Sequence, residues 1–123
     1  MDYDISVSAV TQYVENQSDP RNDKYLFAYT ITISNTGDAP AQLISRHWII
    51  TDGRGHEQQV RGEGVVGEQP HLRPGQSFEY TSAAMIETPV GSMHGSYQMR
   101  GDDGTEFDAL IAPFRLAVPG SLN

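Results

Sequence analysis

Cysteine is absent from the 123-residue sequence, which excludes disulfides, thiolate metal sites and catalysis by a cysteine nucleophile. Long apolar runs are absent too, so no segment is expected to insert into a membrane. The first residues, 1–5, are acidic and lack the basic start and apolar core of a signal peptide. Together these absences predict a protein of the reducing cytoplasm.

Basic residues are scarce, with Lys and Arg totalling 8 against 16 Asp and Glu, for a formal charge of −8. Binding to nucleic acid depends on clustered basic side chains, so no nucleic-acid partner is predicted. Between residues 46 and 73 the charges cancel, so a small anion would meet the least repulsion there; the alternative is an ordinary solvated surface of mixed charge. The charged residues of this neutral segment are Arg46, Asp52, Arg54, Glu57, Arg61, Glu63, Glu68 and Arg73.

Helical periodicity is also missing, and most segments alternate apolar and polar residues, which is typical of strands with one buried face. The pattern predicts one all-β domain over residues 1–123, an antiparallel two-sheet sandwich of about seven strands. It would resemble immunoglobulin or fibronectin type III domains, with a small barrel as the alternative. The expected strands cover residues 3–9, 27–34, 42–51, 56–61, 78–82, 93–100 and 107–118.

The last expected strand changes its buried parity near Pro113, from Phe107 and Ile111 on odd positions to Phe114 and Leu116 on even ones. One extra residue in a strand reverses the facing of every residue beyond it, and proline is tolerated at such bulges. The parity change therefore predicts a β-bulge around Pro113.

The segment 62–70, which we call the glycine loop, has the spacing G-x-G-x-x-G, formed by Gly62, Gly64 and Gly67. In dinucleotide-binding domains these glycines precede a helix whose first amides bind pyrophosphate. Here Pro70 and Pro74 follow closely, and proline inside a helix removes a donor and clashes with the preceding turn. The local context therefore excludes a Rossmann site.

Two interpretations of the glycine loop remain open. In the first, its N–H groups form a concave anion site to which nearby arginines add charge-assisted hydrogen bonds. In the second, the loop is a tight crossover between the two sheets, with glycines at positive φ or at close approaches. The candidate ligand-binding residues are Arg46, Arg61, Gly62, Gly64, Val65, Val66, Gly67, Glu68, Gln69 and Arg73.

The remaining chemistry-bearing residues favour structural roles. The four histidines, His47, His56, His71 and His94, lack the close spacing of a local metal motif. The segment 102–104, Asp-Asp-Gly, is better explained as a hairpin turn than as a cation ligand. Trp48 is expected in the core, and Tyr97 in the core at a corner of the sandwich. No catalytic residue, cofactor or metal site is predicted.

A family resemblance covers most of the chain and rests on six segments: 46–52 (RHWIITD), 60–70 (VRGEGVVGEQP), 72–75 (LRPG), 78–80 (FEY), 88–89 (TP) and 93–99 (MHGSYQM). The sequence resembles the bacterial ApaG family. The resemblance implies a fibronectin type III-like sandwich, an association with cobalt resistance and magnesium efflux, and, from related eukaryotic domains, a role in protein interaction. It implies no catalytic residues.

These observations support three hypotheses about function. The first is a non-enzymatic interaction domain that presents the glycine loop to a protein partner, marked by exposed apolar surface around Val65 and Val66. The second is a binder or hydrolase of phosphate-containing anions such as pyrophosphate nucleotides, for which Glu63 and Glu68 are the only acids within the loop. The third is direct sensing of divalent cations through the acidic surface.

Overall fold

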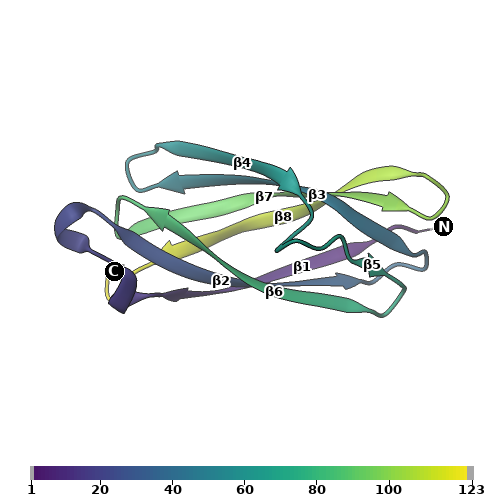
Figure 1. Ribbon diagram of the computed structural model, residues 1–123, viewed down its shortest axis with the longest axis horizontal. Coiled ribbons are helices and arrows are strands. Elements are labelled where there is room, and N and C mark those ends of the chain that lie inside the picture. The colour runs from purple at the N-terminus through teal and green to yellow at the C-terminus, as the bar shows by residue number, and fades with distance from the viewer. Residues whose placement is uncertain (1, 122–123) are drawn as a thin grey trace.

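The computed structural model describes residues 2–121, which form two antiparallel sheets packed face to face (Figure 1). The smaller sheet has the strand order β1-β2-β6, and the larger has β4-β3-β7-β8, with β5 also paired to β3. The strands are β1 (Ile5–Tyr13), β2 (Tyr25–Asn35), β3 (Ala41–Asp52), β4 (Glu57–Glu63), β5 (His71–Leu72), β6 (Ser77–Ile86), β7 (Val90–Gly101) and β8 (Glu106–Ala117). The predicted sandwich is confirmed.

All seven expected strands are present, and the two-residue β5 is an addition. Most strands are longer than expected, and β1 and β6 extend furthest at their C-terminal ends, to Tyr13 and Ile86. In β6 the extension contains two alanines, which are weak strand formers, yet Ala84 and Ile86 keep the alternation and are buried. The only helices within residues 2–121 are the single 3₁₀ turns η1 (Glu15–Gln17) and η2 (Pro20–Asn22), and none is long and apolar enough to span a membrane.

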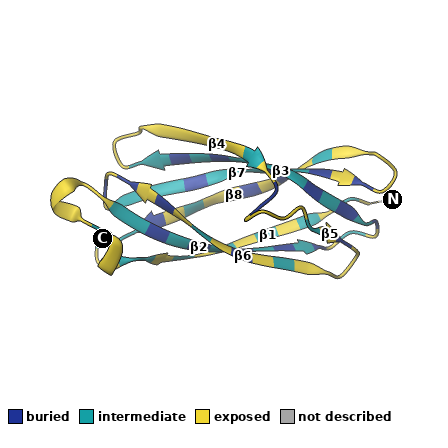
Figure 2. Cartoon of the chain, viewed as in Figure 1, coloured by how far each residue is buried: buried dark blue, intermediate teal, exposed yellow. Residues whose placement is uncertain are grey.

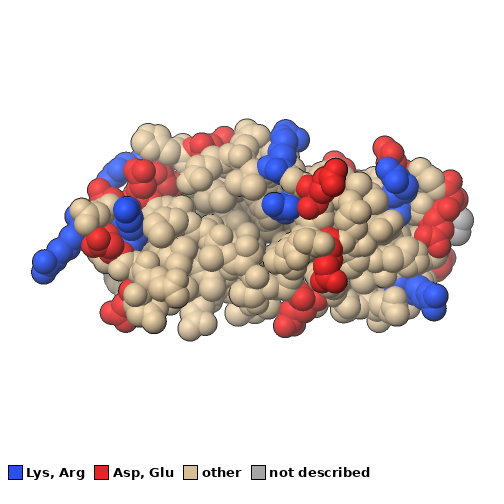
Figure 3. Space-filling model, in the orientation of Figure 1, with Lys and Arg blue, Asp and Glu red and all other residues tan. Residues whose placement is uncertain are grey.

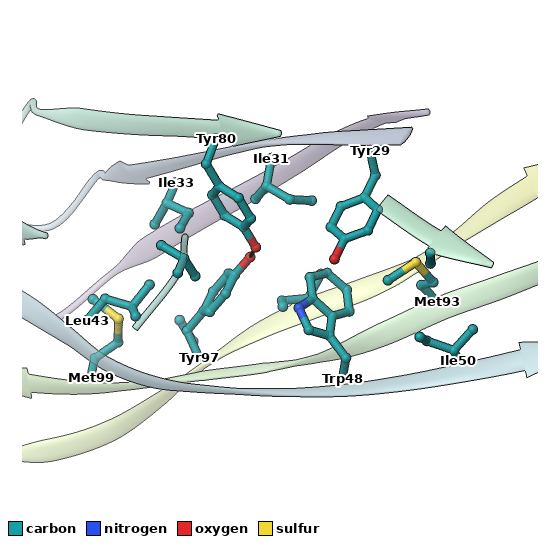
Figure 4. Close-up of a cluster of buried hydrophobic side chains, with 14 of the residues drawn as sticks. Tyr29, Ile31, Ile33, Leu43, Trp48, Ile50, Tyr80, Met93, Tyr97 and Met99 are labelled. Carbon is teal, nitrogen blue, oxygen red and sulfur yellow. Dashed lines mark hydrogen bonds between the residues drawn. The ribbon is translucent and has the colours of Figure 1, made fainter. Parts of the chain in front are cut away.

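The core lies between the facing sides of the two sheets, where alternate residues of each strand are buried (Figure 2). Trp48 on β3 is 2 % exposed and packs against Tyr29 of the opposite sheet, with ring centroids 5.5 Å apart. Tyr97 on β7 is fully buried, and its hydroxyl lies 2.5 Å from that of Tyr80 on β6 (Figure 4). This pair joins the two sheets through their polar atoms, so each buried hydroxyl has a partner. Core positions for Trp48 and Tyr97 are confirmed.

Two β-bulges shape the larger sheet. In β8 the register changes from Ile111 opposite Gly95 to Phe114 opposite Met93, which places one extra residue at 112–113 and confirms the predicted bulge. In β3 the register changes from Leu43 to Ser45, so Ile44 is the extra residue. The adjacent apolar residues of β3 therefore reflect a bulge as well as the central position of this strand between β4 and β7.

The segment 102–104 forms the hairpin turn between β7 and β8, as predicted. Gly104 adopts a φ of +86° and its amide donates to Gly101 O at 2.9 Å. The Asp103 carboxylate accepts the amide of Thr105 at 3.0 Å and the hydroxyl of Tyr3 at 2.5 Å. Both acidic residues of the turn are thus engaged in local structure, since Asp102 accepts a bond from His71 at 2.8 Å.

Candidate functional site

The glycine loop begins where β4 ends and folds into a two-residue hairpin turn. Val65 N donates to Glu68 O at 2.8 Å, and Glu68 N donates to Val65 O at 2.9 Å. The two residues between them, Val66 and Gly67, have φ angles of +44° and +82°. Two successive positive φ angles inside a mutually bonded pair define a type I′ turn, so the loop is locally a miniature hairpin.

The bulge residue of β3 anchors this turn to the sheet. The Ile44 carbonyl accepts the amide of Gly64 at 2.9 Å and the side-chain amide of Gln69 at 2.9 Å. Beyond the turn, Leu43 N donates to Pro70 O at 3.0 Å. The loop therefore stays beside β3 in one sheet, and the chain crosses to the other sheet later, at 73–76 between β5 and β6. The prediction of a crossover within the glycine loop is wrong for this reason.

Arg46 acts as a clamp over the beginning of the loop. Its Nη1 donates to Glu63 O at 3.1 Å and to Gly64 O at 2.9 Å. The guanidinium lies flat on Gly62, because a Cβ built on this glycine would be 2.8 Å from Cζ and both Nη atoms of Arg46. Gly62 therefore leaves room for the arginine side chain in this position, where it binds the carbonyls of Glu63 and Gly64 at the end of β4.

The other two glycines have different physical roles. Gly64 has a φ of +61°, and a Cβ there would clash with Glu68 O, so both conformation and space demand glycine. Gly67 needs glycine only for its φ of +82°, since a Cβ added there would meet nothing within 4 Å. The three glycines of the motif thus serve a clamp, a close backbone approach and a turn.

The two valines of the loop separate into a core residue and a surface residue. Val65 is 1 % exposed and belongs to the hydrophobic core cluster. Val66 is 56 % exposed, although it is β-branched and occupies a positive φ that such residues rarely adopt. Val65 therefore cannot offer its side chain to a ligand, whereas Val66 is presented at the tip of the turn.

Three of the loop amides that an anion would use already have acceptors. Gly64, Val65 and Glu68 donate to backbone carbonyls, whereas the amides of Glu63, Val66, Gly67 and Gln69 have no acceptor in the part of the chain that the structure describes. An anion-binding nest alternates right-handed and left-handed residues, whereas Val66 and Gly67 both have positive φ. The loop conformation is that of a hairpin turn rather than an alternating nest, and the anion hypothesis stays a prediction.

The charged candidates are dispersed. Arg61 pairs across the sheet with His47 and projects from the outer face, while Arg73 lies in the turn that follows β5. Arg46 and Arg61 border one open hollow of about 540 Å³, but Glu63 and Asp108 border it too, so the local charges cancel. Figure 3 shows basic and acidic side chains interspersed, with no large region of one sign on the visible face.

Three of the four histidines contact separate polar partners. His71 contacts Asp102 at 2.8 Å and His56 contacts Asp52 at 3.5 Å, while His47 Nε2 lies 3.0 Å from Gln59 Oε1. Residues 2–121 contain no group of three or more His, Cys, Asp or Glu side chains suited to hold a metal ion.

The buried tyrosine pair is held in its neutral form. Burial raises the pKa of Tyr80 to about 12 and, with Tyr80 beside it, raises that of Tyr97 further. Both phenols therefore stay protonated at neutral pH, and their hydroxyls serve to join the sheets.

A groove opens along the sandwich edge between β4 and β6, with a volume of about 340 Å³. Trp48 and Tyr29 form part of its lining, and the partly exposed Val60 and Met85 stand on its two sides at 38 % and 40 % exposure. Arg46 also lines this groove and, through its bonds to Glu63 and Gly64, holds the glycine loop next to it. Exposed apolar side chains thus border this edge from β4, from β6 and from the loop.

Comparison with known proteins identifies the family of this chain. The family model for the ApaG domain matches residues 15–101. The chain belongs to the ApaG family. It is 60% identical over 121 residues to Protein ApaG of Pseudomonas entomophila, covering 98% of this chain and 96% of that one. It is 61% identical to Protein ApaG of Azoarcus sp., with 98% and 95% covered.

A similar solved structure has the same architecture. The crystal structure of a Bordetella pertussis protein described as ApaA has a TM-score of 0.94 and 55% identity, with 97% of each chain covered. The ApaG family membership predicted from the motif segments is therefore confirmed, together with the sandwich fold. The family name carries no molecular activity, so function has to be argued from the site.

Sequence reasoning missed three features of this site. The Ile44 bulge was hidden because an apolar residue on the wrong parity also fits a central strand. The contact between Arg46 and Gly62 could have been predicted if the strand register were known. An arginine opposite a glycine on a paired strand has room to lie over that glycine. The groove residue Met85 lay outside the expected strand, whose end was placed at residue 82.

Proposed function

We propose that this chain is a non-enzymatic protein-interaction domain that binds its partner through the glycine loop and the adjoining edge of the sandwich. The observation that carries the proposal is Val66. An exposed β-branched residue at φ +44° is strained, and strain of this kind persists where the surrounding structure enforces it, often at functional positions. Asparagine is the preferred residue at the first central position of a type I′ turn ending in glycine, so valine is a costly choice for folding alone.

The surroundings of Val66 support the same proposal. The groove between β4 and β6 lies beside the loop and brings Val60 and Met85 to the surface, and gathered apolar side chains of this kind mark interaction sites. Arg46 holds the loop in place from within, which is how a rigid scaffold presents a recognition turn. A chain without cysteine is suited to a reducing compartment, so we expect the partner to be cytoplasmic.

Pyrophosphate binding or hydrolysis has weaker support. Three loop amides and the Arg46 guanidinium already bind carbonyl oxygens of the chain itself. Glu63 and Glu68 are exposed, and no metal-ligating group accompanies them among residues 2–121. Catalysis would require a base and metal ligands within reach of the loop. The association with cobalt resistance and magnesium efflux stays a prediction from the family resemblance.

Site-specific photo-crosslinking in living cells tests the proposal. A benzoylphenylalanine in place of Glu68, at the base of the turn, should yield a discrete adduct with a different protein. The adduct should fall several-fold when Val66→Asn is added. The same reporter in place of Leu110, which is 76 % exposed on β8, is the matched control and should give no such adduct. Equal adducts from the two positions, or an adduct that Val66→Asn leaves unchanged, would overturn the proposal.

A further inference from the structure

The strand β4 offers an open hydrogen-bonding edge. Among residues 2–121, β3 is the only strand that pairs with β4. All residues of β4 except Gly62 are exposed. Figure 2 shows it as a largely exposed strand along one margin of the molecule. An edge strand of this kind is a template for pairing with another strand.

The register shows which backbone groups of β4 point outward. Asp52 N donates to His56 O at one end, and Gly64 N donates to Ile44 O at the other. The pairing between these ends is continuous, and hydrogen-bonded pairs alternate with non-hydrogen-bonded pairs along it. The backbone N–H and C=O groups of even-numbered β4 residues therefore bond to β3, and those of odd-numbered residues do not. Glu57, Gln59 and Arg61 therefore direct their N–H and C=O groups away from the sheet.

The side chains of this edge are complementary to a second copy of the same edge. If two β4 strands run antiparallel about a twofold axis at Gln59, Glu57 of each copy lies directly opposite Arg61 of the other. Gln59 then pairs with itself, and all three residues meet the partner at hydrogen-bonded positions. Opposite charges at facing positions stabilise antiparallel strands, and like charges destabilise them.

Two further observations favour a copy of this chain as the occupant. The charges between residues 46 and 73 cancel, so two chains of charge −8 would repel each other least when they meet at β4. On the inner face of the paired strands, Val60 of each copy would face Gln58 of the other, which covers a valine that is 38 % exposed in the single chain. The second open edge, β6, has Glu79 as the only charge between Ser77 and Ile86 and lacks this self-complementarity.

We propose that two copies of this chain associate through antiparallel β4–β4 pairing centred on Gln59, with reciprocal Glu57–Arg61 ion pairs, into one continuous sheet. The contact is short compared with a stable interface, so the dimer is of the weak, reversible class. It goes beyond the proposed function, because binding of a different protein at Val66 does not require it.

Sedimentation velocity of the purified chain, between about 10 μM and 1 mM, tests the dimer. Wild type should dimerise with rising concentration. The single variants Glu57→Arg and Arg61→Glu each place like charges opposite one another and should weaken the dimer about tenfold or more. An equimolar mixture of the two variants should dimerise again, because both facing pairs in the mixed dimer are opposite in charge.

Matched controls carry the same change of net charge elsewhere. Glu79→Arg on β6 and Arg115→Glu on β8 are exposed substitutions that should leave the dimer within about threefold of wild type, because neither lies on the paired edge. A wild type that stays monomeric overturns the proposal, as do single variants that dimerise like wild type or a mixture that fails to recover. Since the assay contains no other protein, its failure leaves the proposed partner binding standing, and a missing crosslink leaves the dimer standing.

Discussion

The two long edges of this sandwich differ in how they are closed. At one edge, β1 and β8 come together: Thr11 on β1 donates to Arg115 O on β8 at 3.4 Å, and the rings of Tyr3 and Phe107 lie 4.9 Å apart. At the other edge, β4 and β6 are separated by a groove. The comparison shows one edge that seals the core and another whose apolar residues remain accessible.

At the open edge, the glycine loop is held in place by contacts within the chain and needs no partner strand. Arg46 binds its carbonyls, Ile44 accepts its amide, and Val65 anchors it in the core. The most exposed apolar residues elsewhere, Val10 and Leu110, lie on the outer faces of different sheets and do not form one surface. Accessible apolar surface is thus concentrated where the loop and the groove meet.

The largest expected contrast between the edges is in core packing. Leu116→Ala on β8 removes a fully buried side chain and should lower the free energy of unfolding by about 3 kcal/mol, by lost burial plus a residual cavity. Val60→Ala on β4 should cost less than about 1 kcal/mol, because this side chain is already partly hydrated. Urea unfolding of both variants measures the difference, and equal losses would contradict the distinction between a sealed and an open edge.

The second contrast lies within the loop. Gly64→Ala should cost about 2 to 3 kcal/mol, because it combines a positive φ with a Cβ that clashes with Glu68 O. Gly67→Ala should cost about 1 kcal/mol, since only its positive φ opposes the change. Thermal unfolding of the matched pair separates the two causes. A larger loss at Gly67 would show that the close approach at Gly64 has been misassigned.

A gain in stability is expected at the tip of the turn. Val66→Asn gives the Asn-Gly sequence that type I′ turns prefer and should raise the free energy of unfolding by about 1 kcal/mol. The exposed position makes loss of packing small, since Val66 is 56 % exposed. Chemical denaturation measures the change. If the variant were less stable, valine would be contributing to the fold, and its assignment to recognition would lose its basis.

The smallest expected effect is on the stability of the sealed edge at acid pH, through the carboxyl group of Asp103. The hydroxyl of Tyr3 and the amide of Thr105 donate to Asp103 and lower the pKa of its carboxyl to about 2. A lowered folded-state pKa stabilises the fold above the ordinary value of about 3.9 and loses that contribution as pH falls toward 2. Tyr3→Phe should return the pKa of Asp103 toward its usual range while the ring still packs on Phe107, as carboxyl-carbon NMR would show. An unchanged titration would contradict the bond.

The sequence predicted the fold well because strand alternation is a local signal. Even the Pro113 bulge was visible, since an extra residue leaves a parity change in the buried positions. The end of β6 was less visible, because Ala83 and Ala84 carry weak strand preference.

The site was harder to predict than the fold. The G-x-G-x-x-G spacing indicates conformational freedom at three positions, but each glycine has a different role here. That Gly62 admits Arg46, and that Gly64 approaches Glu68 O, depends on which strands pair and in what register. Val65 is buried and the adjacent Val66 is exposed because the chain forms a type I′ turn here. The pattern of apolar residues does not predict that turn.

The most direct test of this account is a titration of the isotope-labelled chain with magnesium pyrophosphate, following backbone amides by two-dimensional NMR. The account assigns the loop to structure and protein contact, so the amides of Val66, Gly67 and Gln69 should not shift saturably up to about millimolar ligand, a concentration that corresponds to a binding free energy of roughly −4 kcal/mol. Saturable shifts confined to these amides and to Arg46 or Arg61 would contradict it and establish the glycine loop as an anion site.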